Sequence, residues 1–414
     1  MSADAASAPA VARAIAGAKA AFGGSWTPSV RATAPGRIEL LGNHLDYNGG
    51  PVLAAAIDRV LTVLARDIDG QPGRLRLVAA DLGMNLEELQ ATAFNGWRHR
   101  APPGSPFDYV RGLVAAVQER PELSLRTPLE VSFAGDVPIG FGLSSSAALC
   151  VALASALVQQ PLEVKQWVLL AQEAEHRAGT PCGTMDQSAS VAGGVIRFDA
   201  ATLTVEHLHP DLGTLAFVVA DSGVDRSLGA SAYPTRVEEA RQILETARRV
   251  LEEDVPDVAA IGRVQMERLT QEGLPPLLAR RLRHIITETE RVELGVAALR
   301  RADWQTFGRL MTASGRSSAT DYDVSHPRVE ELVRDILRVE GVLGARMMGG
   351  GGGGTALALL PGDQVATLET SLRQGYYARY AMNDREDLVQ PCAFAPGARL
   401  ETAPFKHGIT DETR

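Results

Sequence analysis

The sequence contains 414 residues, of which 41 are Lys or Arg and 50 are Asp or Glu, so its formal net charge is -9. Because 45% of the residues are hydrophobic and 22% are charged, the composition is typical of a folded globular chain and excludes a disordered one. The excess of acidic residues argues against a protein built to bind the phosphates of nucleic acid.

Hydrophobic periodicity predicts an α+β fold of alternating helices and strands. In chain order we expect a helix over 11–22, strands over 57–65, 75–79 and 129–133, helices over 145–158 and 162–176, and strands over 194–198 and 215–220. From 233 to about 310 the pattern changes to charged helices, followed by a buried strand over 355–360 and a helix over 364–374. We place the boundary between the two halves of the chain near 199–221.

The location of the protein can also be predicted from the sequence. The first ten residues lack a basic start and an apolar run, so we expect no secretory signal. The longest apolar segment, 147–158, is too short and too rich in Ser and Ala to cross a bilayer. Cys150, Cys182 and Cys392 lie far apart in no metal-ligand spacing, which favours free thiols. We therefore expect a cytoplasmic protein that contacts no membrane.

Glycine is the compositional outlier, with 40 residues where average usage near 7% would give roughly 29. The surplus gathers around 36–50, 135–142 and 349–354. Since glycine allows sharp turns and a close approach of the backbone to a ligand, we expect these segments to serve one site.

The segment VPIGFGLSSSAAL at 137–149 lies between a predicted strand and a predicted helix. Its glycines let backbone amide groups approach an anion, and its serines add hydroxyl groups at the positive end of the helix dipole. This pattern favours a phosphate-binding loop in which a serine can also bind Mg²⁺. The Gly-Lys-Ser/Thr ending of the Walker loop is absent, and a glycine turn with a serine N-cap is the alternative.

Two further segments carry polar residues in unusual settings. In APGRIELLGNHLDYNGG at 34–50, a basic residue, His44, Asp46 and their neighbours supply many donors and acceptors, which suits a polyhydroxylated ligand. The alternative is a polar turn before a strand. In CGTMDQS at 182–188, Asp186 has almost no charged neighbours, so it can serve as a general base or merely as a helix or turn cap.

Together, these segments resemble the galactokinase branch of the GHMP small-molecule kinases. The resemblance rests on three blocks in the family's order, 36–50, 140–149 and 347–355, with supporting matches at 174–176, 182–187, 231–236 and 321–325. It spans roughly residues 30 to 360. It implies the GHMP kinase fold, in which two α/β lobes with mixed and antiparallel sheets enclose the active site. We expect the N-terminal domain over 1–205 and the C-terminal domain over 206–414.

The resemblance also implies a reaction, the transfer of the γ-phosphoryl group of ATP to the anomeric hydroxyl of a monosaccharide. Galactose is the sugar we expect before any other. By similarity, Asp186 accepts the hydroxyl proton and Arg37 stabilises the transferred group. The residues implied for the sugar are Asn43, His44, Asp46, Gly183 and Tyr233. Those implied for ATP are Gly140, Gly142, Leu143, Ser144, Ser145, Ser146, Ala147, Gly350 and Gly351. Mg²⁺ is assigned to Ser146 and Glu175, with Glu173 as the alternative ligand, and a monomer is expected because the family is usually monomeric.

Two departures from the family pattern concern the sugar. Family members usually carry a glutamate where this chain has Asn43, at a position expected to contact the sugar near its O6, and Asp225 occupies a position that is usually basic. Loss of the carboxylate would suit an acidic or a shorter sugar. The alternatives are therefore a kinase of the same family for galacturonate, L-arabinose or an N-acetylhexosamine, and a non-catalytic sugar and ATP sensor. The complete serine loop argues against the sensor.

Other polar residues are expected to be structural. Six histidines show no metal-ligand spacing, and we expect them at the surface or at helix caps. They are His99, His207, His209, His284, His326 and His407. The stretch 236–249 is expected to form a solvated helix face with i,i+4 ion pairs.

Overall fold

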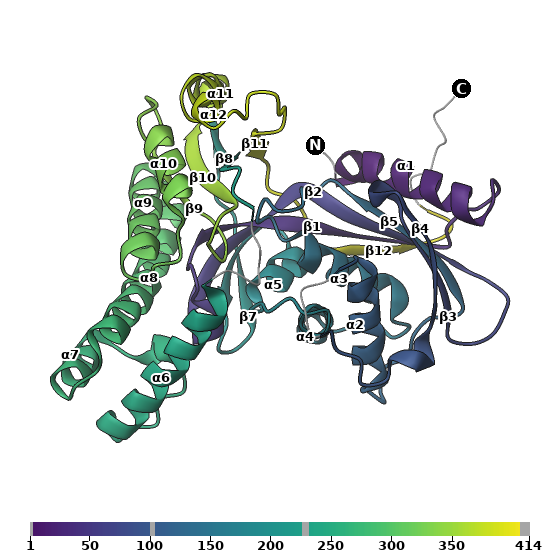
Figure 1. Cartoon of the computed structure of the whole chain (residues 1–414), viewed down its shortest axis with the longest axis horizontal. Helices are drawn as coiled ribbons and strands as arrows, with labels where there is room; N and C mark the ends of the chain where they lie inside the picture. The colour runs from purple at the N-terminus through teal and green to yellow at the C-terminus, as the bar shows by residue number, and fades with distance from the viewer. Residues whose placement is uncertain (1–2, 100–103, 226–231, 406–414) are drawn as a thin grey trace.

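The chain is built around two β-sheets (Figure 1). The structure is a computed structural model that describes residues 3–99, 104–225 and 232–405. The larger sheet has the strand order β12-β1-β2-β5-β3-β4, with β6 paired to β2 and β7 paired to β6. Its strands are β1 (Val30–Leu41), β2 (Pro51–Asp67), β3 (Arg74–Ala79), β4 (Met84–Gln90), β5 (Leu129–Gly135), β6 (Val195–Asp199), β7 (Thr204–Leu208) and β12 (Arg399–Thr402). Because β3 and β5 are parallel and the other neighbours are antiparallel, this sheet is mixed.

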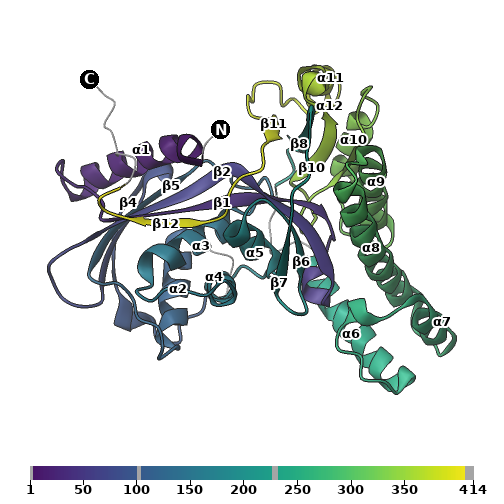
Figure 2. The ribbon, with the colours of Figure 1, turned by 180° about the vertical axis from the view of Figure 1, so that it is seen from behind.

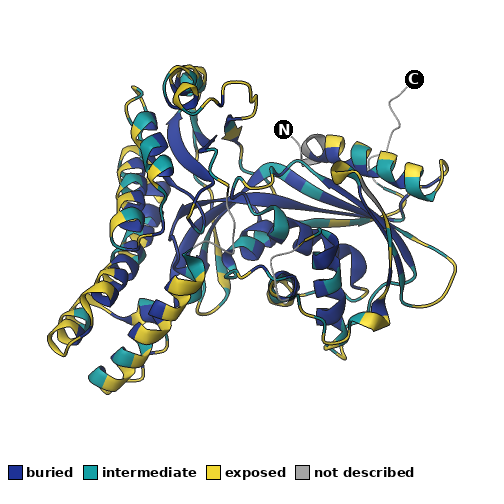
Figure 3. Cartoon of the chain, viewed as in Figure 1, coloured by how far each residue is buried: buried dark blue, intermediate teal, exposed yellow. Residues whose placement is uncertain are grey.

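Helices cover both faces of the larger sheet (Figures 1 and 2). Helix α1 (Ala3–Phe22) packs on one face, and α2 (Phe107–Gln118), α3 (Ser145–Leu157), α4 (Val164–Arg177) and α5 (Met185–Ala192) lie on the other. Every residue of β1 is buried, as expected for a strand covered on both sides. Helix α3 is buried from Ala147 to Leu157, so its alanine-rich sequence fits a position at the centre of the lobe (Figure 3).

The smaller sheet is antiparallel, with the order β11-β8-β10-β9. Its strands are β8 (Leu215–Asp221), β9 (Gly344–Met347), β10 (Thr355–Pro361) and β11 (Val389–Cys392). The helices of this half are α6 (Tyr233–Leu251), α7 (Arg263–Gln271), α8 (Pro276–Arg300), α9 (Trp304–Thr320), α10 (Pro327–Ile336), α11 (Val365–Gln374) and α12 (Tyr376–Arg379). Short 3₁₀ turns occur at Asp46–Asn48, Ala80–Leu82, Ala91–Phe94, Val258–Ala260 and Gly362–Gln364. No helix in the described ranges is long and apolar enough to span a bilayer.

The predicted α+β class with one mixed and one antiparallel sheet is confirmed. Each predicted helix and strand is present, with its ends shifted by a few residues in most cases. The first helix is the largest exception, since it begins at Ala3 rather than 11 and continues through Pro9. Strand β1 was not predicted, because Pro35, Gly36 and the polar residues within it disguise the strand pattern.

The division into 1–205 and 206–414 stays a prediction, but two strands cross it. Strand β7 contains the division point and pairs with β6, and β12 returns from the end of the described chain to pair with β1. The larger sheet therefore includes residues from both sides of the predicted boundary.

Two expectations about charged and polar residues are wrong. His284 is fully buried in α8 rather than exposed, whereas His326 caps α10 as expected and His407 lies outside the described residues. At the start of α6, Arg236 and Glu239 are buried and ion-paired, although the rest of the stretch contains exposed pairs. The three cysteines are free thiols, as expected.

Candidate active site

A cavity of about 280 Å³ collects residues that lie far apart in the sequence. The predicted site residues that line it are Arg37, Asn43, His44, Asp46, Gly140, Gly142, Leu143, Ser144, Ser145, Ser146, Glu175, Gly183, Asp186, Tyr233 and Gly350. Ala147 and Gly351 do not line it. Ala147 is buried inside α3, and a Cβ on Gly351 would lie 2.0 Å from the Val324 carbonyl oxygen, so this glycine serves chain packing.

The centre of the cavity is an ion pair between β1 and α5. The Arg37 Nε atom donates to Asp186 Oδ1 at 2.8 Å, and a second guanidinium nitrogen lies 2.6 Å from the same oxygen. Ser144 donates its hydroxyl proton to the other carboxylate oxygen. Arg37 also donates to the Gly142 carbonyl at 2.6 Å. Both oxygens of Asp186 are therefore held in a fixed orientation by charged or hydroxyl donors.

The loop between β5 and α3 has the backbone of an anion site. Gly140, Gly142 and Ser144 have positive φ angles of 86°, 70° and 61°, which turn the chain sharply before the N-terminus of α3. A Cβ on Gly36 would lie 2.6 Å from the Leu143 carbonyl oxygen, so β1 can approach the loop only with glycine there. Thr355, after the third glycine segment, donates to the Phe141 carbonyl at 2.9 Å. The three glycine-rich segments thus meet at this loop.

Glu175 is a buried carboxylate beside the loop. Burial raises its pKa to about 7, a hydrogen bond from Ser146 opposes this shift, and the charge of Asp186 adds to it. Glu173 instead forms ion pairs with Arg177 at 2.7 Å and Arg98 at 2.9 Å and does not line the cavity. Of the two glutamates, Glu175 therefore has the position required of a metal ligand.

The turn that follows β1 presents His44 and Asp46 to the cavity. His44 adopts a φ of 62°, unusual for a residue with a side chain, and its Nδ1 atom lies 2.9 Å from the Tyr47 hydroxyl. Burial raises the pKa of Asp46 to about 7, with further contributions from the charges of Asp186 and Glu39. A Cβ on Gly183 would lie 1.7 Å from Asp46 Oδ2, so a side chain at that position would displace this carboxylate.

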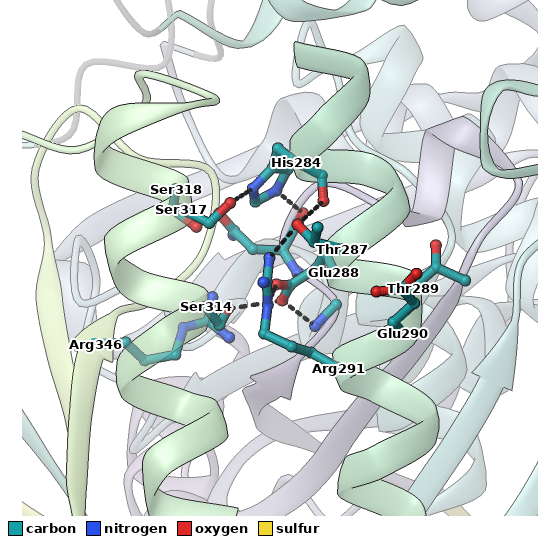
Figure 4. Close-up of polar contacts among 12 residues, drawn as sticks. His284, Thr287, Glu288, Thr289, Glu290, Arg291, Ser314, Ser317, Ser318 and Arg346 are labelled. Atoms are coloured by element: carbon teal, nitrogen blue, oxygen red, sulfur yellow. Dashed lines mark hydrogen bonds and ion pairs between the residues drawn. The ribbon is translucent and has the colours of Figure 1, made fainter. Parts of the chain in front are cut away.

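Helix α8 anchors the same turn (Figure 4). Glu288 Oε1 accepts hydrogen bonds from the backbone amides of Gly42 at 2.8 Å and Asn43 at 3.1 Å. His284 Nε2 lies 3.0 Å from the Asn43 carbonyl oxygen, which can only accept, so this nitrogen carries the proton and Nδ1 accepts from Ser317 at 2.9 Å. Burial lowers the pKa of His284 to about 4, which keeps the ring neutral.

These anchoring residues were not predicted as part of the site. His284 and Glu288 lie more than 240 residues from the turn they hold, and only their i,i+4 spacing on α8 places them on one face. Although burial opposes it, the positive charge of Arg291 contributes most to lowering the pKa of Glu288, to about 2. The carboxylate is therefore ionised where it meets the two backbone amides.

The Asn43 side chain makes three hydrogen bonds within the protein. Its Nδ2 atom donates to Glu39 Oε1 at 3.1 Å and to the Gly349 carbonyl at 2.9 Å, while its Oδ1 atom accepts from Ser318 at 2.9 Å. Both amide hydrogens are thus already donated. That Asn43 contacts a sugar stays a prediction, and the carboxylate in this corner of the cavity belongs to Glu39.

Known proteins resemble this chain over most of its length. The galactokinase galactose-binding signature matches residues 19–67, the N-terminal domain of GHMP kinases matches 108–194, and the C-terminal domain of GHMP kinases matches 296–378. The galactokinase of Roseiflexus sp. (strain RS-1) is 36% identical over 363 residues, which cover 84% of this chain and 88% of that protein. The chain belongs to the galactokinase family.

Further sequence and structure comparisons support the same family and fold. The galactokinase of Homo sapiens is 36% identical over 377 residues, covering 85% of this chain and 89% of that protein. The crystal structure of Lactococcus lactis galactokinase complexed with galactose matches with a TM-score of 0.82 at 26% identity, over 92% of this chain and 97% of that one. The mevalonate kinase of Methanococcus jannaschii, at 16% identity and a TM-score of 0.60, shares the fold. The predicted family and fold are therefore confirmed.

Proposed function

We propose that this chain transfers the γ-phosphoryl group of ATP to the anomeric hydroxyl of galactose. The observation that carries the proposal is the Arg37–Asp186–Ser144 contact, which lies in the cavity of a galactokinase-family chain beside an anion-binding loop. Phosphoryl transfer requires positioned reactants and compensated charge more than covalent participation by the protein. This arrangement supplies both.

In the proposed reaction, the anomeric oxygen attacks the γ-phosphorus while its proton passes to Asp186. The bond between the γ-phosphorus and the bridging oxygen breaks, and ADP leaves with that oxygen. Arg37 orients Asp186 and offsets the charge of the transferred group, and the loop amides with the α3 N-terminus hold the phosphates. His44, Asp46 and Tyr233 would orient the sugar in the other part of the cavity.

A second cavity, of about 310 Å³, is suited to the nucleobase. It shares Tyr109, Ile139, Ser145 and Ser146 with the first cavity, so the phosphate loop and the start of α3 border both. Its apolar walls include Leu61, Leu82, Pro106, Phe133 and Leu149. A flat aromatic base matches such walls. We assign it to adenine, which places the phosphates toward Asp186.

Ser146 and Glu175 are the proposed Mg²⁺ ligands, and their chemistry fits the ion. Glu175 is a buried carboxylate whose raised pKa reflects a lack of compensating charge, which a divalent cation would supply. Among the described residues, no group of three or more His, Cys, Asp or Glu side chains could hold a metal. Mg²⁺ needs only one or two carboxylates and completes its shell with waters and substrate phosphates, so Glu175 and Ser146 suffice as protein ligands. When bound, the ion would offset the negative charge of the ATP phosphates.

The test is sugar-dependent ADP release by the purified chain. We expect the highest kcat/KM with galactose among galactose, galacturonate, L-arabinose and N-acetylgalactosamine. A higher kcat/KM with another sugar would make that sugar the assigned substrate. The absence of turnover with every sugar would refute the kinase proposal. The division at 205/206 and the monomeric state belong to the same proposal, and sedimentation velocity would test the latter.

A further inference from the structure

Glu39 is a carboxylate of the cavity to which the proposed reaction gives no role. It lies on β1 two residues after Arg37, and the register between them is regular, with Arg37 opposite Ala56 and Glu39 opposite Ala54. Alternate residues of a strand share a face, so the two side chains point to the same side, roughly 7 Å apart along the strand. Both line the cavity. Since Arg37 holds Asp186, Glu39 lies one strand repeat away from the Arg37–Asp186 pair.

The hydrogen bonds of Glu39 occupy one of its two oxygens. Oε1 accepts from Arg346 at 2.6 Å and from Asn43 Nδ2 at 3.1 Å. In the part of the chain that the structure describes, no hydrogen bond reaches Oε2. A carboxylate can accept about four hydrogen bonds. Glu39 is only 3% exposed and what remains open faces the cavity, so Oε2 is positioned as an acceptor for a ligand.

The surroundings of Glu39 fix the direction of its side chain. Arg346 is fully buried, pairs with Oε1 and is itself held by the carbonyl oxygens of Leu40 and Met347. Asn43 in turn is held by Gly349 and Ser318. A long side chain that could adopt several rotamers is thus locked in one. A purely structural ion pair would not require that one oxygen be left toward the cavity.

We infer that Glu39 determines sugar specificity by accepting a hydrogen bond from a hydroxyl at the end of the ring remote from the anomeric carbon. The inference rests on the proposed function, because the sugar must lie between Asp186 and Glu39. It also reverses the expectation drawn from Asn43. With the Glu39 carboxylate in the cavity, a uronate carboxylate placed at that hydroxyl position would meet a second carboxylate, so neutral hexoses are favoured over acidic sugars.

The experiment compares wild type with Glu39→Gln on galactose and its 2-deoxy, 4-deoxy and 6-deoxy analogues. The amide keeps the shape of the side chain but replaces one acceptor oxygen with a donor group. We expect kcat/KM for galactose to fall roughly 10- to 100-fold, the range of a hydrogen bond to a charged group. We also expect the wild-type preference for galactose over one 4-deoxy or 6-deoxy analogue to shrink by a similar factor, with the 2-deoxy ratio unchanged.

Glu130→Gln is the matched control. Glu130 is also 3% exposed and pairs with two arginines, Arg66 and Arg76, but it does not line the cavity. We expect it to lower the melting temperature without changing any sugar ratio. Equal losses on all four sugars with Glu39→Gln would overturn the inference and leave Glu39 a partner of Arg346 only.

Two further measurements keep the result decisive. If Glu39→Gln does not fold, Glu39→Asp keeps the charge beside Arg346 but shortens the reach, and it must show the same loss of deoxy-sugar discrimination. If the wild type releases no ADP, the proposed function fails. The same sugar ratios are then measured as Kd by calorimetry, and ratios equal in wild type and Glu39→Gln would overturn the inference separately.

Discussion

A single methyl group at position 183 should disable the sugar side of the cavity. In Gly183→Ala, the new Cβ would lie 1.7 Å from Asp46 Oδ2 and 2.3 Å from its Cγ, whereas such contacts are not shorter than 3.0 Å. The carboxylate must therefore retreat by at least about 1.3 Å. Misplacement of a positioning group by about 1 Å can lower a rate by about 100-fold. We expect a loss of that size in kcat/KM for the sugar.

The assay is ADP release against sugar concentration, with ATP affinity measured separately by calorimetry. Nucleotide binding should change little, because Gly183 faces Asp46 rather than the phosphate loop. Gly24→Ala serves as the control, since nothing lies within 4 Å of a Cβ there and Gly24 is exposed. Wild-type kcat/KM in Gly183→Ala, with both variants folded, would refute the argument that Asp46 is held in place by close packing against Gly183.

Three further predictions concern charged groups. Asp186→Asn should lower kcat by roughly 100- to 10,000-fold with little change in ATP affinity, and near-normal turnover would exclude Asp186 as the base. Glu175→Gln should raise the Mg²⁺ concentration needed for half-maximal activity, whereas Glu173→Gln should not; equal effects would contradict the assignment. His284 has a native pKa of about 4 against 6.5 for the unfolded chain, so the unfolded state binds more protons between these values. The free energy of unfolding should thus fall by about 3 kcal/mol as pH drops from 6.5 to 4. When this free energy is measured by urea unfolding at several pH values, it should depend less on pH in His284→Gln than in wild type.

The sequence predicts those parts of the site in which the residue type is required by the local backbone conformation. Gly140 and Gly142 occupy backbone angles that favour glycine, and the serines after them begin a helix, so a short segment carries its own signal. Asp186 was found from its nearly uncharged neighbours in the chain, although its partners Arg37 and Ser144 come from distant segments. The α+β class was likewise predictable, since hydrophobic periodicity is a local property, whereas the mixed sheet was implied only by the family resemblance.

The rest depends on contacts between distant segments. In the sequence, Glu288 and His284 are indistinguishable from the other polar residues of a charged helix. They hold the turn after β1 only because α8 packs against it. Asn43 shows the same limit. Its residue type indicates a lost carboxylate, but the side chain meets Ser318 and Glu39, and the charge in that corner is carried by a residue four positions earlier.

The pairing of β12 with β1 has a consequence for synthesis. The strand that carries Arg37 is covered along one edge by residues 399–402, and Arg31 meets Glu401 across a separation of 370 positions. During translation, that edge stays open until nearly the whole described chain has left the ribosome. An open strand edge can pair with other chains. The larger sheet is therefore completed only once residues 399–402 have been synthesised, and a helper that shields the edge of β1 until then would raise the yield of active enzyme.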